Sequence, residues 1–371
     1  MQAAQGGNQV GGHGGAPRDA ALTRLRFFLI GWVIIYHLDL SLHVSEVLPP
    51  LAPLFRHGYL GVDGFFLLSG FALWLGYGAR PPRGFSGAVQ FLRRRFAKIW
   101  PLHALALLAL ALLVGLAIAA GATIREPERF APREFLLQLF MVNAWETTDR
   151  HAWNYPSWAL SVEWAGYLAF PLLVLAVGRL PRVLLPALPL AGLLGLVLMS
   201  GWDETIGLNY TLDFGLLRFA LEFLTGLGIG RLASGGMLPR PLLAVLLIGL
   251  PLGLWFAQDA AVVLALAALI PLLHRPEAAP ATGRPDLLLR LGEASFGVYL
   301  CWVFIETGLV GLQRVMQPGP GGRVALMLVG FLASLVAGWL AWRFVEVPVQ
   351  RWLLRRGAGR PVASGALPAR Q

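Results

Sequence analysis

Charged side chains and cysteine are both scarce in this sequence. Only 13% of its 371 residues are charged, whereas a soluble globular protein has about 25%. The sequence is 57% hydrophobic with a mean hydropathy of +0.65, and apolar runs of about 20 residues recur along it, which predicts membrane-spanning helices. The single cysteine, Cys301, excludes an internal disulfide. The composition therefore predicts a polytopic, all-α membrane protein.

Ten apolar segments are expected to cross the membrane. They are residues 25–45, 58–78, 99–120, 157–177, 183–201, 216–233, 241–257, 260–273, 292–312 and 324–345. The Gly-rich start has no evident cleavable signal peptide and predicts a disordered cytoplasmic tail over 1–22. The transmembrane domain is then 23–352, and 353–371 is a cytoplasmic C-terminal tail.

The net charge of +10 is explained by topology. If the N-terminus is cytoplasmic, 22 of the 30 basic residues fall on the inner side and seven on the outer side, as expected because basic residues collect on the cytoplasmic side. We therefore expect both termini to be cytoplasmic and no nucleic-acid partner. Segment 121–156 is then external, and its apolar middle, 135–145, is too short to cross, so it lies at the interface or re-enters. No internal repeat favours an inverted-repeat transporter.

The first predicted span, within "RLRFFLIGWVIIYHLDL", carries an arginine and a histidine whose spacing places them on one side of a helix. Arg26 and His37 are 11 residues apart, which is about 16 Å along a helix and within about 20° of the same face. Arginine can bind phosphate oxygens with its fork of donors, and histidine suits proton transfer near neutral pH. Asp39 is about 200° around the helix from His37 and is not expected to be its partner. The alternative is an anchoring arginine and an unrelated structural histidine.

Two carboxylates lie within other predicted spans. Asp63 shares the segment 58–78 with Ser69, and Glu163 lies two turns inside a span together with Ser161. Ionisable groups are costly inside a membrane, so both carboxylates are candidates for function, with His37 as a possible partner. A packing helix with an interfacial aspartate is the competing interpretation for Asp63.

A basic cluster precedes the third span. Arg94, Arg95 and Lys98 lie in "FLRRRFAKIWPLH", and residues three apart share a helix face. They are suited to an anionic ligand on the cytoplasmic side, although anchoring at the inner surface is the commoner role of such a cluster.

The order of these motifs resembles the membrane-bound acyltransferase 3 family, bacterial O-acyltransferases of surface polysaccharides and related glycans. The resemblance covers the chain from about Thr23 to Trp352. The matching blocks are Arg26–ten residues–His37, "GVDGFFLLSGF" (61–71), the basic pair before "IWP", "WALSVEWAGYLAFPLL" (158–173), "LGEASFGVYL" (291–300) and "VEVP" (345–348).

The sequence also departs from the family pattern. The second arginine of the basic pair is Lys98, which keeps the charge but loses the fork. Relatives often have a histidine shortly after "YL", whereas this chain has Trp302 in "CWVF". The usual "LDGLR" opening reads "LTRLR", and no appended hydrolase-like domain is present in the sequence.

The resemblance implies a reaction and a set of roles. The donor is acyl-coenzyme A, most often acetyl, with its phosphates expected at Arg26, Arg94, Arg95 and Lys98. His37 is the expected general base, with Glu163 or Asp63 orienting it, and Ser69, Trp158 and Ser161 are expected to line the acceptor site. A covalent acyl-histidine relay remains an open alternative. We expect neither a metal ion nor a permanently bound cofactor.

The acceptor is expected to be a glycan or glycolipid hydroxyl, and the location a bacterial inner membrane, in contact with lipids. The acyl group and the acceptor are not encoded in any readable motif. Two other classes fit the same buried charges: a transporter or flippase without acyl chemistry, and a nonenzymatic partner in an export complex.

Overall fold

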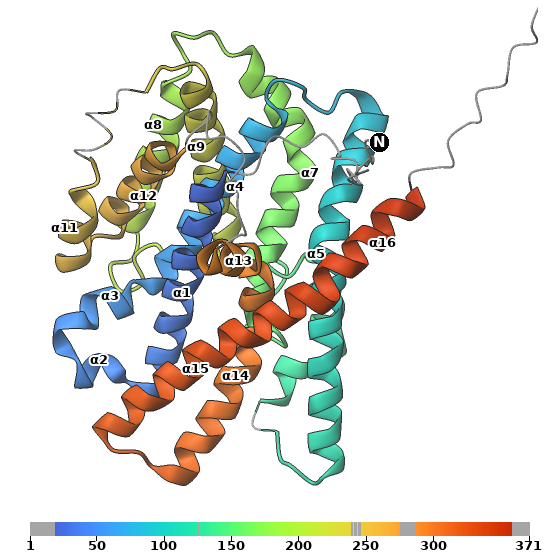
Figure 1. Ribbon diagram of the computed structural model, residues 1–371, viewed down its shortest axis with the longest axis vertical. Coiled ribbons are helices and arrows are strands. Elements are labelled where there is room, and N and C mark those ends of the chain that lie inside the picture. Colours follow the sequence, from blue (N-terminus) through green and yellow to red (C-terminus); the bar gives the residue numbers. More distant parts are fainter. Residues whose placement is uncertain are drawn as a thin grey trace, which may run out of the picture.

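The computed structural model describes residues 19–357 except 125, 239, 241, 242, 244, 245 and 275–285. Regular structure over these residues is entirely helical (Figure 1). Six helical segments are long and apolar enough to cross a membrane. They are α1 (Ala20–Leu42), Pro49–Tyr77 with α4 (Gly61–Tyr77), α5 (Gly84–Ala119), Tyr155–Arg179 with α7 (Trp158–Arg179), α14 (Ser295–Met316) and Pro320–Arg355 with α15 (Pro320–Ala341). The prediction of a polytopic helical membrane protein is confirmed.

Shorter helices complete the bundle. Predicted spans 183–201, 216–233 and 260–273 correspond to α8 (Ala187–Ser200), α9 (Gly215–Ser234) and α12 (Asp259–Leu273). The described part of predicted span 241–257 holds α11 (Gly249–Trp255), which is too short to cross a membrane. The remaining elements are α2 (Val44–Val47), α3 (Ala52–Arg56), α6 (Pro132–Leu139), α13 (Leu287–Glu293), α16 (Val347–Gly357), the 3-10 turns Pro49–Leu51, Gly58–Leu60, Pro127–Phe130 and Tyr155–Ser157, and a π-helical turn at Trp342–Glu346.

The helices can be located in the view of Figure 1 by their place across the bundle. Helix α5 stands at one side, α8, α9, α11 and α12 stand at the other, and α1, α4 and α7 lie between them. Helices α15 and α16 form one long, oblique rod across the bundle. The candidate site lies among the central helices.

Helix α1 has defined ends. Asp19 caps its start by accepting hydrogen bonds from Ala21 N (2.9 Å) and Leu22 N (3.2 Å), as an N-cap aspartate does. The helix thus begins inside the predicted tail 1–22, whose residues 1–18 lie outside the described part of the chain. His43 ends it in the left-handed region (φ 53°), and buried Asp39 accepts from Ser45 N at 2.6 Å. Asp39 therefore secures the turn that follows α1, consistent with its predicted direction away from His37.

Segment 121–156 turns back alongside α5. His103 Nε2 lies 2.7 Å from the carbonyl oxygen of Gln138 in α6, while α5 continues to Ala119, about 24 Å further along the axis. Ser161 of α7 donates to Met141 O and accepts from Ala144 N, both at 3.0 Å. The segment is therefore docked against α5 and α7, which brings its polar residues to the start of α7.

Glycine allows α4 and α9 to pack with their backbones in contact. A Cβ on Gly70 would lie 2.1 Å from Phe223 O, and one on Gly226 would lie 2.1 Å from Leu67 O. No side chain fits at either position, so these glycines set the separation of the two helices, as small residues do in membrane bundles.

This packing predicts a position-specific effect of alanine. Gly70→Ala is expected to destabilise the fold by about 1–3 kcal/mol because α4 and α9 must separate. Gly76→Ala on the same helix is the matched control, since a Cβ there meets no atom within 4 Å. Thermal unfolding of the purified protein in detergent measures the difference, and equal midpoints for the two variants would contradict the packing argument.

Candidate active site

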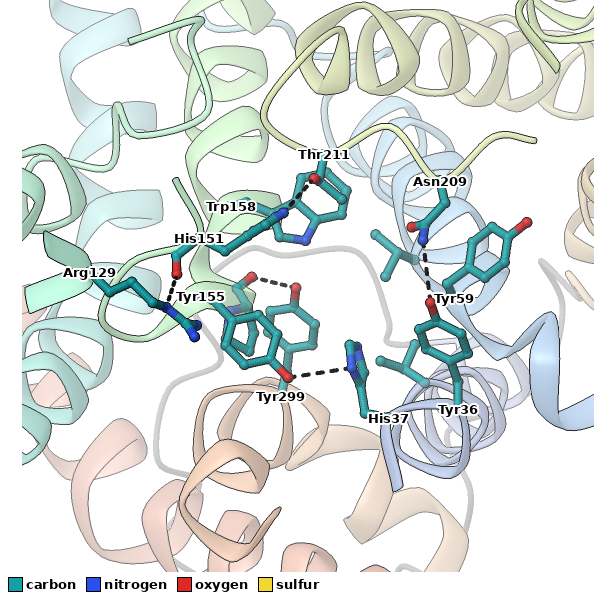
Figure 2. A pocket seen from close by; sticks show the side chains of 13 residues that line it. Tyr36, His37, Tyr59, Arg129, His151, Tyr155, Trp158, Asn209, Thr211 and Tyr299 are labelled. Atoms are coloured by element: carbon teal, nitrogen blue, oxygen red, sulfur yellow. Dashed lines mark hydrogen bonds between the residues drawn. The ribbon is translucent and has the colours of Figure 1, made fainter. Parts of the chain in front are cut away.

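His37 lines a cavity of about 240 Å³ near the C-terminal end of α1 (Figure 2). The residues around it come from α1, α4, α7, α14 and the connecting segments. They are Val33, Tyr36, His37, Tyr59, Val62, Arg129, His151, Tyr155, Pro156, Trp158, Asn209, Thr211 and Tyr299. Most of the wall is aromatic, with polar groups at a few points, which is the usual make-up of a small-molecule site.

The His37 ring is held on two sides. It stacks on Trp302 of α14 with ring centroids 4.2 Å apart and planes at 24°. The hydroxyl of Tyr155 lies 3.5 Å from His37 Nδ1, and Figure 2 shows the two side chains facing each other. Trp302 thus occupies the position where the resemblance leads one to expect a histidine, and it contacts His37 directly.

A chain of hydrogen bonds extends behind Tyr155. The Tyr155 hydroxyl donates to Glu306 Oε2 (3.1 Å), and the Ser41 hydroxyl donates to Glu306 Oε1 (2.7 Å). Ser41 is on α1, one turn beyond His37, and Glu306 is on α14. Glu306 is therefore the carboxylate connected to His37, by hydrogen bonds that run through Tyr155.

The other end of the cavity is lined by polar side chains that form hydrogen bonds with one another or with the backbone. His151 Nε2 lies 3.2 Å from Thr211 Oγ1, Arg129 Nε donates to His151 O (2.8 Å), and Asn209 donates to the Tyr36 hydroxyl (3.3 Å). Partial burial lowers the pKa of His151, and the neighbouring Arg129 guanidinium lowers it further. Burial and Arg129 thus both favour the neutral form of His151, and Arg129 supplies positive charge at this end of the cavity.

Asp63 belongs to a buried ionic cluster. Arg218 of α9 binds it through two nitrogens, with Nε at 3.1 Å from Oδ1, and Glu222 lies 3.7 Å from Arg218 Nε. All three side chains are fully buried. Arg218 also lies over the ring of Trp158, 5.6 Å from its centroid. Asp63 therefore supports the cavity wall from behind, and its hydrogen bonds go to Arg218 rather than to His37.

Glu163 lies in a second polar cluster on α7. It accepts hydrogen bonds from Ser69 (2.9 Å) and from the Tyr167 hydroxyl (2.5 Å). The Tyr167 ring in turn faces the Arg95 guanidinium, 5.3 Å from its centroid. The structure thus joins three predicted site residues, Ser69, Glu163 and Arg95, in one cluster separate from His37.

The remaining predicted residues are distributed as follows. Trp158 lines the cavity, and Ser161 is buried and bonded to the 141–144 loop. Arg94 is exposed and Arg26 is half-buried, whereas Lys98 forms an ion pair with buried Glu346. Arg26 and His37 share the unbroken helix α1, so the separation of about 16 Å along one face holds.

Two contacts of His37, Tyr155 and Trp302, and the carboxylate behind Tyr155, Glu306, were not among the predicted site residues. Glu306 lies within predicted span 292–312, so the rule that intramembrane carboxylates are functional candidates would have found it. Tyr155 and Trp302 carry no such signal, because aromatic residues are common in membrane proteins near the interface.

Comparisons with known proteins identify the family and two relatives of this chain. A family model described as "Acyltransferase domain" matches residues 19–343. The chain is similar to "Acyltransferase MdmB" of Streptomyces mycarofaciens, at 30% identity over 94% of this chain and 95% of the relative. It is also similar to "Exopolysaccharide production protein ExoZ" of Rhizobium meliloti, at 28% identity over 84% of this chain and 94% of the relative. No solved structure matches significantly.

Proposed function

Because the chain belongs to the acyltransferase 3 family, we propose that it moves an acyl group, most often acetyl, from cytoplasmic acyl-coenzyme A to a hydroxyl of a glycan or glycolipid. The observation that carries this proposal is the placement of His37 inside an aromatic-walled cavity, near the end of a helix whose first two turns carry Arg24 and Arg26. A histidine in such a cavity is within reach of a bound hydroxyl and able to take its proton.

The acceptor is proposed to enter from the outer side. The cavity lies near the C-terminal end of α1, and its polar end is built from segments 120–157 and 201–214. The distribution of basic residues supports an outer location for both segments. Aromatic faces together with Asn209, Thr211 and Arg129 suit a sugar ring with its hydroxyls. The name of one relative, an exopolysaccharide production protein, agrees with a glycan acceptor.

The donor is proposed to approach along α1 and α7 from the opposite side. On α7, Trp158 lines the cavity, Glu163 follows about 7.5 Å further along, and Tyr167 follows at about 13.5 Å. Tyr167 faces Arg95, and on α1 the same direction leads from His37 to Arg26. Two helices thus carry polar groups from the cavity toward the basic end of the bundle, which carries Arg26, Arg94 and Arg95. The phosphates of coenzyme A would bind there.

The reaction needs one proton acceptor that later becomes a donor. His37 takes the proton of the acceptor hydroxyl as its oxygen attacks the thioester carbonyl, the carbon–sulfur bond breaks, and the protonated histidine returns the proton to the coenzyme A thiolate. The products are the ester and free coenzyme A, so no net proton is released. Catalysis by a positioned base contributes about 10²–10⁴-fold.

Arg94 is the basic residue whose role is easiest to test. It is exposed at the basic end, whereas Lys98 and Arg95 already contact other side chains. Arg94→Ala is expected to raise the apparent KM for acetyl-coenzyme A about 10- to 100-fold, as expected from a lost charge-assisted hydrogen bond of about 1.5–3 kcal/mol, with kcat little changed. Steady-state kinetics at varied donor concentration measure this.

The matched control is Arg80→Ala, which removes an exposed arginine from the loop before α5 and should leave the donor KM unchanged. An Arg94→Ala variant with a normal donor KM but impaired acceptor use would contradict the proposed donor route.

A further inference from the structure

Counting hydrogens assigns the donor and the acceptor in the hydrogen bonds that link His37, Tyr155 and Glu306. Glu306 accepts two hydrogen bonds, one from Ser41 (2.7 Å) and one from Tyr155 (3.1 Å). A tyrosine hydroxyl has one hydrogen to donate, and in Tyr155 that hydrogen is directed at Glu306. The oxygen of Tyr155 can therefore meet His37 Nδ1, 3.5 Å away, only as an acceptor.

An accepting oxygen at Nδ1 determines which nitrogen of His37 carries the proton. Neutral imidazole has one N–H and one bare nitrogen. If Nδ1–H donates to Tyr155, then Nε2 is the bare nitrogen, and it is the atom able to take a proton. The ring cannot easily turn to exchange the two, because it is stacked on the 1%-exposed Trp302.

We propose that Tyr155 and Glu306 are positioning residues that keep the proton of His37 on Nδ1, so that Nε2 serves as the base. Glu306 takes the part of the carboxylate in a serine–histidine–aspartate triad, with Tyr155 inserted between carboxylate and imidazole. The chemical consequence rests on the proposed function, whereas the position of the proton is a property of the protein alone.

The arrangement also stabilises the intermediate state of the reaction. When Nε2 takes the hydroxyl proton, the imidazole becomes positively charged. The charge of Glu306 is transmitted through the polarised Tyr155 hydroxyl, and hydrogen bonds in such a chain strengthen one another. The bond at 3.5 Å is long, and catalytic hydrogen bonds often shorten when substrate binds.

The other carboxylates near the cavity have different partners. Asp63 is bound by Arg218, and Glu163 by Ser69 and Tyr167. Asp259 accepts from the Tyr59 hydroxyl at 2.5 Å and from Leu208 N at 2.7 Å. Among the described residues, Glu306 is the carboxylate that hydrogen bonds connect to His37, through Tyr155.

Two variants test the positioning role by kinetics. Glu306→Gln keeps the shape but removes the charge, and Tyr155→Phe keeps the ring but removes the oxygen. Each is expected to lower kcat about 10- to 100-fold, with both KM values within about threefold of wild type. The loss should be smaller than the about 10⁴-fold effect of the aspartate-to-asparagine change in a serine protease, because Tyr155 separates Glu306 from His37.

The double variant sharpens this test. Residues that act through one path are not additive, so Glu306→Gln/Tyr155→Phe should be no slower than about the slower single variant. Glu46→Gln is the control, because it removes an exposed glutamate paired with Arg323 that has no part in the path. Losses that multiply in the double variant, or single variants with kcat within threefold of wild type, would overturn the proposal.

The tautomer itself can be observed by nitrogen NMR of detergent-solubilised protein carrying ¹⁵N-labelled histidine. The His37 signals are identified by their loss in His37→Gln among the seven histidines. Wild type should show the hydrogen on Nδ1, and both variants should shift population to the Nε2–H form. An Nε2–H form in wild type, or an unchanged tautomer in both variants, would refute the positioning role. This measurement needs no substrate, so it stands even if the protein fails to transfer acyl groups.

Discussion

Replacing His37 by alanine is expected to lower the rate of acyl transfer about 10²–10⁴-fold, the usual contribution of a positioned general base. The reason is that His37 is the histidine placed within the aromatic wall beside Tyr155 and Trp302. The measurement is steady-state transfer of labelled acetyl groups by purified protein, at matched expression and with matched elution profiles in detergent.

Leu40→Ala is the matched control for this change. Leu40 is three residues further along α1, and its side chain is exposed on the outside of the bundle, so its loss should leave kcat within about twofold. Substantial transfer by a well-folded His37→Ala protein would contradict the assignment of His37 as the base.

Breaking the buried pair between Asp63 and Arg218 is expected to be the most damaging single change to the fold. Asp63→Ala removes the hydrogen-bonded partner of the fully buried Arg218 guanidinium and leaves Glu222, 3.7 Å from Arg218 Nε, as the remaining carboxylate of the cluster; breaking a buried pair costs about 3–5 kcal/mol. The expected result is a large fall in the apparent Tm of the solubilised protein, or a failure to accumulate folded protein.

Two controls distinguish the effect of breaking this buried cluster from a general effect of removing a charged side chain. Asp63→Leu/Arg218→Met/Glu222→Leu removes the whole buried cluster and should recover a large part of the lost stability, because replacing all members of a buried ionic cluster by apolar groups is often tolerated. Arg24→Ala breaks the exposed pair with Asp286 and should change the apparent Tm little. If Asp63→Ala unfolds at the same temperature as wild type, the cluster is not structurally important.

The helical fold could be predicted because apolar runs and charge asymmetry are local signals. The six long helices fall on the predicted spans at 25–45, 58–78, 99–120, 157–177, 292–312 and 324–345. The position of segment 121–156 was harder to predict from sequence, because it depends on contacts with residues distant in the chain. The segment contacts His103 on one helix and Ser161 on another, and no sequence pattern within the segment indicates these contacts.

The candidate site could be predicted only in part. Helix periodicity was enough to relate Arg26 to His37, because both lie on α1. The pairing of carboxylates depends on how helices pack, so Asp63 and Glu163 were plausible partners of His37 from sequence, yet the structure places them with Arg218 and Tyr167. Glu306 was present in a predicted span, but only the packing of α1 against α14 brings it near His37.

The transporter alternative makes a different prediction about the same pocket. A transporter or flippase would move a glycan without consuming acyl-coenzyme A, and a nonenzymatic partner would tolerate the loss of His37. The family assignment supports acyl-transfer chemistry, and the proposed use of His37 connects that chemistry to a specific atom.

The most direct test is transfer across sealed vesicles of purified protein. Labelled acetyl-coenzyme A is supplied on the side of the basic loops and a glycan acceptor only on the opposite side, with His37→Ala vesicles in parallel. The account predicts labelled ester on the acceptor, matched by free coenzyme A on the donor side, in wild-type vesicles and almost none in His37→Ala. Label that remains on coenzyme A, or equal transfer by both proteins, would contradict it.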